Sequence, residues 1–408
     1  MGSTLRIAWR NLWRNRRRTV LALAAIALSQ ALVLFYGGIL RGYSGWTVEA
    51  ITGPMLGHIQ VHAAGWRRQR SMDAALAHLG RTLAALRRAP GVADAHARLY
   101  APALAAAGEK GYGVVVLGVE PAAESGPAGL LRVTPALPAE RRVLVGRPLA
   151  TRMGLAAGDT IAIVGSGADG SLANDLFVVA GLIDTPVDLV NQMGVVMELG
   201  EAQGLFAMPD GAHEIVVHAR QPDEARALAE RLARLPELAG AEVLDWKRLE
   251  PALVALVRLI DQVWLFMLAL VFIAAASGIA NTMLMATYER IHELGMLLAL
   301  GAAPRRIVAM VVAESLALGL TGALAGSVLG ASIVAATRST GIDLAAISRG
   351  APRELSFAGL SVSMRIYPSL ALDHLVQGVL AVLVTSIVAS AWPAWRAARL
   401  EPQQALRA

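Results

Sequence analysis

The feature that most constrains this sequence is a set of four apolar stretches, each long enough to cross a lipid bilayer. The first runs from Val20 to Leu40, and its clearest polar interruptions are Ser29 and Gln30. As a helix rising 1.5 Å per residue it spans about 31 Å, the thickness of a bilayer core. A cleaved signal peptide has a shorter apolar region and a small-residue cleavage site, whereas this stretch ends in Arg41-Gly42-Tyr43. We therefore predict a retained transmembrane helix.

Three further apolar stretches lie toward the C-terminus: Val263 to Met285, Ile307 to about Ala336, and Leu375 to about Trp392, the last ending at Pro393. An apolar segment from Leu253 to Val257 leads into the first of them, which predicts a helix that begins outside the bilayer as a stalk. The chain is 17% charged, whereas an average soluble domain is roughly 25% charged. The sequence therefore predicts an α-helical membrane protein with four transmembrane helices.

Basic residues predict which side of the membrane each end of the chain occupies. Arginines without any acidic residue precede the first stretch, and arginines also lie in the Glu289–Arg306 connection and in the C-terminal tail. The positive-inside rule places these regions, and hence both termini, in the cytoplasm. Near the N-terminus, Leu5, Trp9, Leu12 and Trp13 share one face, which predicts a short helix in the headgroup plane.

The long segment between the first and second stretches predicts one α+β domain outside the cytoplasm. Its alternating or continuous apolar runs predict strands at His58–His62, Gly113–Val119, Arg142–Val145, Thr160–Val164, Leu176–Leu182 and Ala241–Leu244. A glycine-rich tract at Gly165–Gly170 predicts a hairpin tip, and Asp223–Leu235 has helical spacing. The predicted organisation is an interfacial helix and first transmembrane helix (1–41), the α+β domain (42–250), a stalk and second helix (251–288), a short cytoplasmic helix (289–304), a third helix (305–337), an outer loop (338–373), and a fourth helix with a cytoplasmic tail (374–408).

Motifs for catalysis are absent from the sequence. The only lysines are Lys110 and Lys247, and neither lies in the Gly-x-x-x-x-Gly-Lys-Ser/Thr loop that an ATPase needs to hold phosphate. No serine-hydrolase elbow or His-Glu-x-x-His pair occurs, and the chain has no cysteine. His58 and His62 have no acidic residues at ligand spacing, so we expect ordinary strand residues and no metal site. The chain is therefore expected to be neither an enzyme nor a direct binder of a cofactor.

The net charge of +6 comes from the segments that flank the apolar stretches, since the domain between them is slightly acidic. This distribution favours an anionic lipid surface over nucleic acid as a partner.

Polar residues in or near the apolar stretches have two interpretations each. Glu314 is expected either to form a buried hydrogen bond or to lie one turn from the interface, or else to serve a substrate path or relay. Arg258 and Asp261 are expected to form a solvated ion pair on the stalk, or else the rim of a membrane entrance. Ser29 and Gln30 are expected either to hydrogen-bond across helices or to line a cavity.

The connection between the second and third stretches is more informative. Ile291, Leu294 and Leu298 form one apolar stripe of a short helix, and Gly301 and Pro304 are suited to end it and to begin the next helix. The other faces carry Glu289, Arg290, His292 and Glu293. The segment is either a simple interfacial connector or a docking element that a cytoplasmic partner pushes.

This connection resembles the coupling region of the FtsX-like permease family. The residues that fit the family pattern are Arg290, Glu293, Leu294, Gly295, Ala299, Gly301 and Ala302. The C-terminal run Pro393–Arg407, the start Ala8–Leu12 and the turn Gly154–Thr160 are also similar to this family. The order of elements also matches MacB and the lipoprotein-releasing LolC/LolE permeases, which have one helix, a large outer domain and three further helices. Many relatives have arginine at the position of Leu298.

The resemblance implies a type VII ABC permease in the bacterial inner membrane, with its large domain in the periplasm. It implies a separate cytoplasmic ATPase that binds ATP and Mg, a second permease (self or paralogue), membrane lipids, and a periplasmic carrier or effector. Motion would pass through the coupling helix and stalk to the outer domain. Gly57–His62 favours lipoprotein release, with the first two helices as a lateral entrance. The alternatives are an FtsX-like regulator of a periplasmic hydrolase and a MacB-like exporter of peptides or drugs.

Overall fold

The computed structural model describes residues 16–108, 110–125, 129–131, 141–185, 187–343, 346, 354–357, 360–363 and 365–399. The interfacial helix predicted before residue 16 and the tail after residue 399 lie outside the described residues. The chain divides into two compact units. We call Met1–Trp46, Leu256–Arg349 and Arg365–Ala408 the helical unit, and Thr47–Ala255 with Gly350–Met364 the sheet unit.

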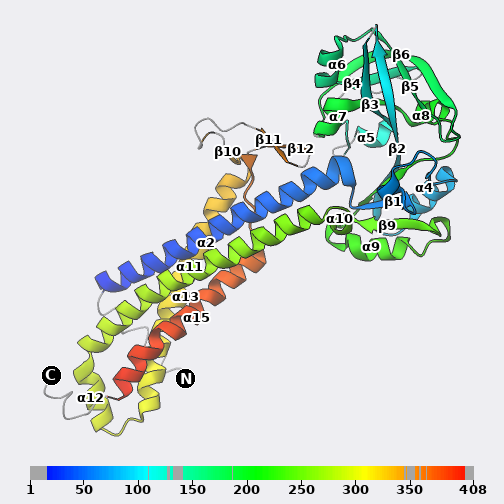
Figure 1. Cartoon of the computed structure of the whole chain (residues 1–408). Coiled ribbons are helices and arrows are strands. Elements are labelled where there is room, and N and C mark those ends of the chain that lie inside the picture. Colours follow the sequence, from blue (N-terminus) through cyan, green and yellow to red (C-terminus); the bar gives the residue numbers. More distant parts are fainter. Residues whose placement is uncertain are drawn as a thin grey trace. The chain divides into compact units, whose positions relative to one another are not determined.

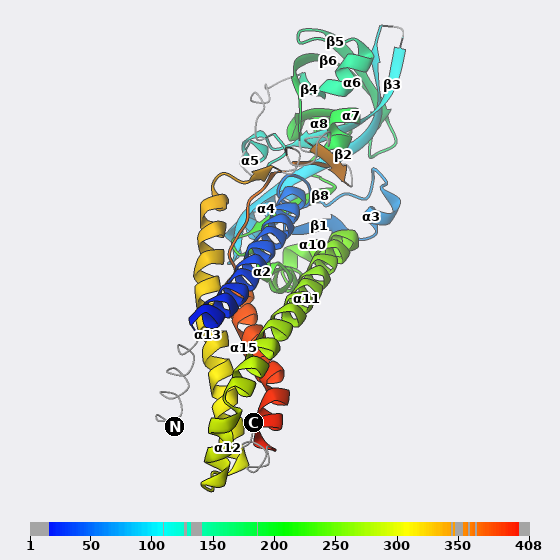
Figure 2. The same ribbon diagram turned by 90° about the vertical axis from the view of Figure 1, so that its left-hand side faces the viewer.

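Four long helices build the helical unit (Figures 1 and 2). They are α2 (Arg16–Ile51), α11 (Pro251–Glu289), α13 (Pro304–Arg338) and α15 (Leu372–Ala398), with the short α12 (Ile291–Ala299) between α11 and α13. Each of the four long helices is long and apolar enough to cross a membrane. Since α11 runs unbroken from Pro251, the predicted stalk and second span form one continuous helix.

The fourth helix does not end at Pro393, so that prediction is wrong. Helix α15 continues through Pro393 to Ala398. A proline inside a helix removes one backbone hydrogen bond and costs about 3 kcal/mol. Pro393 and Ala397 are buried, and Ala397 packs with Leu294 and Ile307, so tertiary contacts offset this cost.

Glycines set how closely the helices of this unit approach each other. A Cβ atom on Gly326 of α13 would overlap the backbone oxygen of Ala27 in α2 and lie 2.7 Å from Cβ of Gln30. Gly322 and Gly330 contact the same helix in the same way, through Ile26 and through Leu34. Small residues allow such close backbone packing in membranes, where the hydrophobic effect does not drive helices together.

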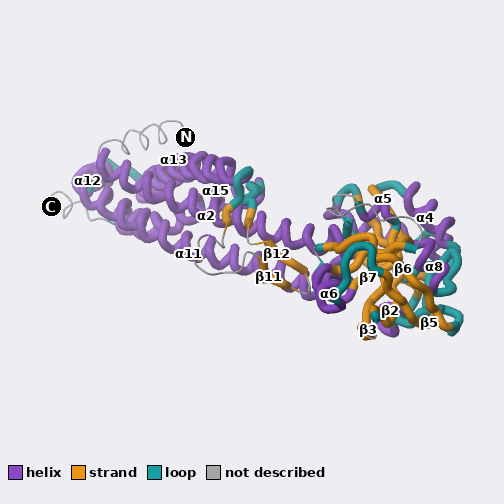
Figure 3. The backbone as a smooth tube through the Cα atoms, turned by 90° about the horizontal axis from the view of Figure 1, so that it is seen from above, coloured by secondary structure: helices purple, strands orange, loops and turns teal. Residues whose placement is uncertain are grey.

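The sheet unit is built on one nine-stranded sheet in the order β3-β7-β4-β6-β5-β2-β8-β1-β9 (Figures 1 and 3). The strands are β1 (Ile59–Ala63), β2 (Val92–Ala107), β3 (Lys110–Val119), β4 (Arg142–Gly146), β5 (Thr160–Ser166), β6 (Leu172–Ile183), β7 (Gly194–Glu198), β8 (Glu214–Ala219) and β9 (Ala241–Asp245). Strands β3–β7 and β4–β6 pair in parallel, and the other neighbours pair antiparallel.

Short helices connect these strands and cover the sheet. They are α3 (Trp66–Gln69), α4 (Leu79–Arg88), α5 (Pro121–Glu124), α6 (Arg147–Met153), α7 (Asp188–Met193), α8 (Leu199–Leu205), α9 (Ala225–Leu232) and α10 (Trp246–Leu249). The buried core contains Val61, Leu99, Val116, Phe177 and Leu228, among others. The sheet unit therefore has an α+β fold.

Every strand predicted in this unit is present, but β2, β7 and β8 were not foreseen. Strand β2 is rich in alanine, which is depleted in strands on average. It forms because β3, β5 and β8 all pair with it and bury its side chains. The predicted helix at Asp223–Leu235 is α9, preceded by a 3₁₀ turn at Pro222–Glu224.

The connection between α13 and α15, predicted as a loop, contains two small antiparallel strand pairs. One pairs β10 (Ile342–Asp343) with β13 (Arg365–Ile366), and the other pairs β11 (Glu354–Phe357) with β12 (Leu360–Ser363). The second pair belongs to the sheet unit, in which β12 contacts α7.

Candidate functional site

The short helix α12 (Ile291–Ala299) lies between the ends of α11 and α13, within the predicted segment 289–304. Gly301 has a positive φ of 86°, which glycine adopts without steric cost and which ends the helix. Pro304 occupies the first turn of α13, where its missing N–H costs nothing. The predicted amphipathic helix with a tight turn into the third span is therefore confirmed.

One face of α12 packs on the helical unit. Leu294 is buried in a cluster with Ile307 of α13 and Ala397 of α15, and Leu298 packs against this cluster. Ile291 is half-buried. Gly295 is also buried. The predicted apolar stripe therefore faces α13 and α15.

The opposite face of α12 exposes apolar side chains. Met296 and Leu297 are exposed, and Leu300 just after the helix is 85% exposed. His292 is exposed on the same short segment. Large apolar side chains clustered on one exposed turn indicate a surface that contacts another protein or the membrane.

Ion pairs tie this segment to two of the long helices. Arg290 Nη1 donates to Glu314 Oε1 of α13 at 2.8 Å, and its Nε donates to Glu293 at 3.2 Å. Glu289 at the end of α11 accepts from Arg18 Nη1 of α2 at 2.7 Å. Since Glu314 is only 6% exposed, the predicted buried hydrogen bond at this position is confirmed. The residue at the start of α12 is therefore joined directly to α13 by an ion pair.

The other polar residues predicted in the spans have separate environments. Gln30 is buried and donates to Ser327 Oγ of α13 at 3.3 Å, which confirms a hydrogen bond across helices. Ser29 lines a cavity between α2 and α11. Arg258 and Asp261 are both exposed, and among the described residues no ion pair joins them, so the predicted pair is wrong. Consecutive turns of one exposed helix hold long side chains too weakly to fix such a pair.

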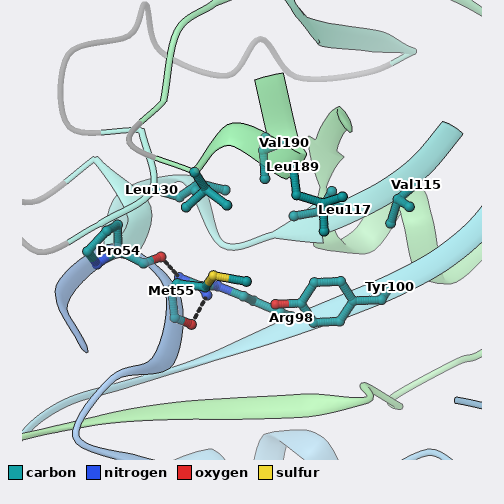
Figure 4. A pocket seen from close by; sticks show the side chains of 10 residues that line it. Pro54, Met55, Arg98, Tyr100, Val115, Leu117, Leu130, Leu189 and Val190 are labelled. Carbon is teal, nitrogen blue, oxygen red and sulfur yellow. Dashed lines mark hydrogen bonds between the residues drawn. The ribbon is translucent and has the colours of Figure 1, made fainter. Parts of the chain in front are cut away.

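A second polar centre lies inside the sheet unit, where the end of α2 meets β2 (Figure 4). After Ile51 the helix continues as one π-helical turn, Thr52–Leu56. Arg98 of β2 donates from Nη1 to the oxygen of Met55 at 2.7 Å and from Nη2 to the oxygen of Pro54 at 2.9 Å. The fully buried guanidinium thus caps carbonyl groups that the helix end leaves without partners.

Glu124 holds this guanidinium in place. Its carboxylate accepts from Nε and Nη2 of Arg98 at 2.5 and 3.0 Å, and the backbone N–H of Leu130 donates to it at 2.8 Å. Burial alone would raise the pKa of Glu124, but the charge of Arg98, its hydrogen bonds to the carboxylate, and the ring of His96, whose Nε2 lies 3.3 Å from Glu124 Oε1, bring it well below its usual range. We call Arg98 and Glu124 the buried pair.

Two further groups surround the buried pair. Tyr100 donates its hydroxyl to Glu214 Oε1 at 3.1 Å. Burial raises the pKa of both side chains. An apolar cavity of about 50 Å³ lies beside Arg98 and Tyr100, walled by Met55, Leu117, Leu130 and Val190 among others (Figure 4). Because the N–H groups of Arg98 are taken up by Glu124 and by backbone oxygens, this cavity presents no free charge.

Several histidines of the sheet unit are buried, and burial keeps His62 and His218 neutral near pH 7. His62 Nδ1 lies 3.2 Å from the oxygen of His213, and its ring stacks on Trp66. Burial lowers the pKa of His62 to about 4 and that of His218 to about 4. Within the part of the chain that the structure describes, no three metal-ligating side chains gather. His62 lies in β1, as predicted for a strand residue, whereas His58 lies just before that strand.

These histidines predict how stability depends on pH. Unfolded, His62 and His218 protonate near pH 6.5, so between about 6.5 and about 4 the unfolded chain binds more protons. The free energy of unfolding should fall as pH drops through this window, by about 1.4 kcal/mol per pH unit for each histidine. His96 does not cancel this effect. Burial would lower the pKa of His96, but Asp94 and Glu124 raise it above its ordinary value overall. The stability that protonated His96 contributes is therefore lost only as pH rises.

Thermal unfolding of the full chain at pH 7, 6 and 5 measures this dependence. His218→Gln should flatten it, whereas the same change at the exposed His78 should leave it unchanged. Equal slopes in all three proteins would contradict the assignment.

Sequence reasoning missed the buried pair entirely. Arg98 lies between the buried Ala97 and Leu99, and Glu124 follows a separate strand. The available signal was a lone arginine inside an apolar run, since a buried charge requires a partner elsewhere in the chain.

Two models of known protein families match this chain. A model of the MacB-like periplasmic core domain matches residues 19–235, and a model of the FtsX-like permease C-terminal domain matches residues 265–402.

The individual proteins that match this chain have low sequence identity to it. The lipoprotein-releasing system transmembrane protein LolC of Xylella fastidiosa is 24% identical over 280 residues, which cover 66% of this chain and 65% of LolC. An uncharacterized ABC transporter permease of Methanocaldococcus jannaschii is 28% identical over 158 residues, covering 38% of this chain and 40% of that protein.

Two solved structures are also similar. The periplasmic region of MacB from Actinobacillus actinomycetemcomitans has a TM-score of 0.34 at 10% identity, covering 48% of this chain and 91% of that one. The extracellular domain of the ABC-type transporter YknZ has a TM-score of 0.33 at 11% identity, covering 46% and 99%.

Proposed function

The chain belongs to the FtsX-like ABC transporter permeases that carry a MacB-like periplasmic core domain, and from this premise we propose that it is the membrane subunit of a type VII ABC system. In this proposal the sheet unit lies in the periplasm, while α12 and both termini lie in the cytoplasm. The arginines that precede α2 and those at the α12 end of the helices support this orientation.

A separate ATPase subunit supplies the energy. The sequence has no phosphate-binding loop, and α12 offers an exposed apolar surface of Met296, Leu297 and Leu300 for a partner to bind. ATP and Mg belong to that partner. Closure of the ATPase pushes α12, and the Arg290–Glu314 and Arg18–Glu289 pairs pass the push to α13 and α2. The observation that carries this proposal is a short helix with one face packed on the unit and one face apolar and exposed.

The substrate we propose is a lipoprotein or another lipid-anchored molecule, which is released at the periplasmic side. A second permease, either another copy of this chain or a paralogue, completes the complex. The match to LolC, whose name describes a lipoprotein-releasing system, supports this choice. Ser29, Gln30, Arg258 and Asp261 are proposed to border its entrance. A periplasmic carrier would accept the substrate.

Substitutions on the exposed face of α12 test the proposal. Met296→Asp and Leu300→Asp together should weaken binding of the ATPase at least about tenfold, because burying each apolar side chain contributes about 2 kcal/mol. Co-purification of the ATPase and its permease-stimulated hydrolysis are the measurements. Leu172→Asp, at an exposed apolar residue of the sheet unit, is the control. Unchanged binding in the double variant would refute docking at α12.

The alternative functions differ in what the periplasmic unit binds. An FtsX-like regulator would retain a cell-wall hydrolase, and a MacB-like exporter would retain an outer-membrane channel. Photocrosslinking from exposed positions of the sheet unit in the full chain separates these outcomes. Capture of a soluble lipoprotein carrier supports release, whereas capture of a hydrolase overturns it.

A further inference from the structure

A cavity of about 310 Å³ lies between α2 and α11 within the helical unit. Its size is within the range of about 300–1,000 Å³ that is typical of ligand pockets. The lining from α2 is Arg18, Leu21, Ala22, Ala25, Ile26 and Ser29, and the lining from α11 runs from Ala274 to Thr282. Leu21, Ala25 and Gly278 are exposed, so the cavity opens onto the surface of the helix pair.

The depth of the cavity corresponds to one leaflet of a bilayer. Arg18 and Ser29 are the outermost lining residues of α2, and at 1.5 Å per residue they are about 16 Å apart along the helix. One leaflet contributes about 15 Å of a hydrocarbon core about 30 Å thick. The Arg18–Glu289 pair marks the α12 end of the cavity. The cavity therefore extends from that membrane surface to about the midplane.

The wall of the cavity is mostly apolar, with Ser29, Asn281 and Thr282 as its uncharged polar lining, and its charged group, Arg18, lies at the α12 end. Arg18 Nη1 is paired with Glu289, but its Nε is buried and has no hydrogen-bond partner among the described residues. Arg16 and Arg17 lie exposed in the same turn. Three consecutive arginines beside a mostly apolar cavity match a molecule with a negative head and a hydrocarbon tail.

We propose that this cavity binds one anionic phospholipid of the cytoplasmic leaflet. An acyl chain fills the space between α2 and α11, and the phosphate accepts hydrogen bonds from Arg18. The inference rests on the orientation given under Proposed function. It concerns the leaflet on the α12 side: of the residues proposed at the substrate entrance, Ser29 lines the far end of this cavity, whereas Arg258 and Asp261 do not line it. The lipid would fix the separation of α2 and α11 at the end where α12 is pushed.

Gly278→Leu tests the site by filling it. A Cβ at Gly278 meets no atom within 4 Å, so the larger side chain enters the cavity without displacing a helix. The full chain is reconstituted in nanodiscs of phosphatidylethanolamine and phosphatidylglycerol, extracted in mild detergent, and its retained lipid is measured by native mass spectrometry. We expect about one phosphatidylglycerol per permease, lost in Gly278→Leu. Ala269→Leu, at an exposed residue of α11 outside the cavity, should retain it.

Arg18→Gln tests the head-group contact. Retention of phosphatidylglycerol should fall about fivefold, the factor that corresponds to about 1 kcal/mol for one arginine at the membrane surface. Phosphatidylethanolamine should be affected less. Equal lipid retention in Gly278→Leu and Ala269→Leu would overturn the proposal. The proposal would also be overturned if Gly278→Leu keeps its lipid but no longer forms a permease dimer in light scattering. That result would show that a second copy of the chain, rather than a lipid, fills the cavity. Lipid retention and light scattering do not depend on ATPase binding. The lipid-site proposal and the proposal that the ATPase docks at α12 can therefore be refuted independently of each other.

Discussion

Replacing Arg98 by methionine is expected to destabilise the sheet unit by about 3–5 kcal/mol, the cost of leaving one partner of a buried ion pair uncompensated. Glu124 would then be a buried carboxylate facing an apolar side chain, and the oxygens of Pro54 and Met55 would lose their donors. For a unit of this size the midpoint of thermal unfolding should fall by on the order of 10 °C. Differential scanning fluorimetry or calorimetry of the full chain in detergent measures the change.

Two comparisons make this prediction specific. Arg147→Met removes an ion pair with Asp184 in which both side chains are exposed, and should change stability by less than about 1 kcal/mol. The double variant Arg98→Met, Glu124→Met removes both charges, so it should recover part of the stability lost in Arg98→Met. A double variant no more stable than the single one would show that capping of the helix end, rather than the buried charge, dominates.

Gly326→Leu is expected to prevent α2 and α13 from packing, with a loss of about 3 kcal/mol or more. Overpacking normally costs about 1–3 kcal/mol because side chains can shift aside. Here the first added carbon overlaps a backbone oxygen, that of Ala27, so a whole helix must move. That movement would also break the Gln30–Ser327 hydrogen bond. Yield of folded protein by size-exclusion fluorescence and its thermal midpoint report the effect.

Gly278→Leu is the matched control for Gly326→Leu. It introduces the same side chain into another span of the same unit, at a position with no atom within 4 Å of the new Cβ. It should therefore give folded protein. If Gly278→Leu and Gly326→Leu lower the yield of folded protein equally, then Gly326 is not required for the close approach of α2 and α13.

Much of the helical unit follows from local properties of the sequence. Hydropathy located the four long helices, because a bilayer requires a minimum run of apolar residues. The apolar spacing of Ile291, Leu294 and Leu298 and the turn residues Gly301 and Pro304 located α12, because periodicity and φ preferences act within a few residues. Continuation of α15 through Pro393 escaped this reasoning, since packing of Ala397 with α12 and α13 lies outside any local window.

The sequence by itself determined how many helices are long enough to span a membrane, that a short amphipathic helix connects the second and third of them, and that the chain has no phosphate-binding loop. Only the tertiary structure decided that Arg98 binds Glu124, that Arg290 binds Glu314, that Gly326 faces α2, and that the alanine-rich β2 is a strand. The physical reason is the range of the interactions. Hydropathy and helix-ending preferences depend on neighbouring residues, whereas the partner of a buried charge or of a glycine is chosen by segments that only folding brings together.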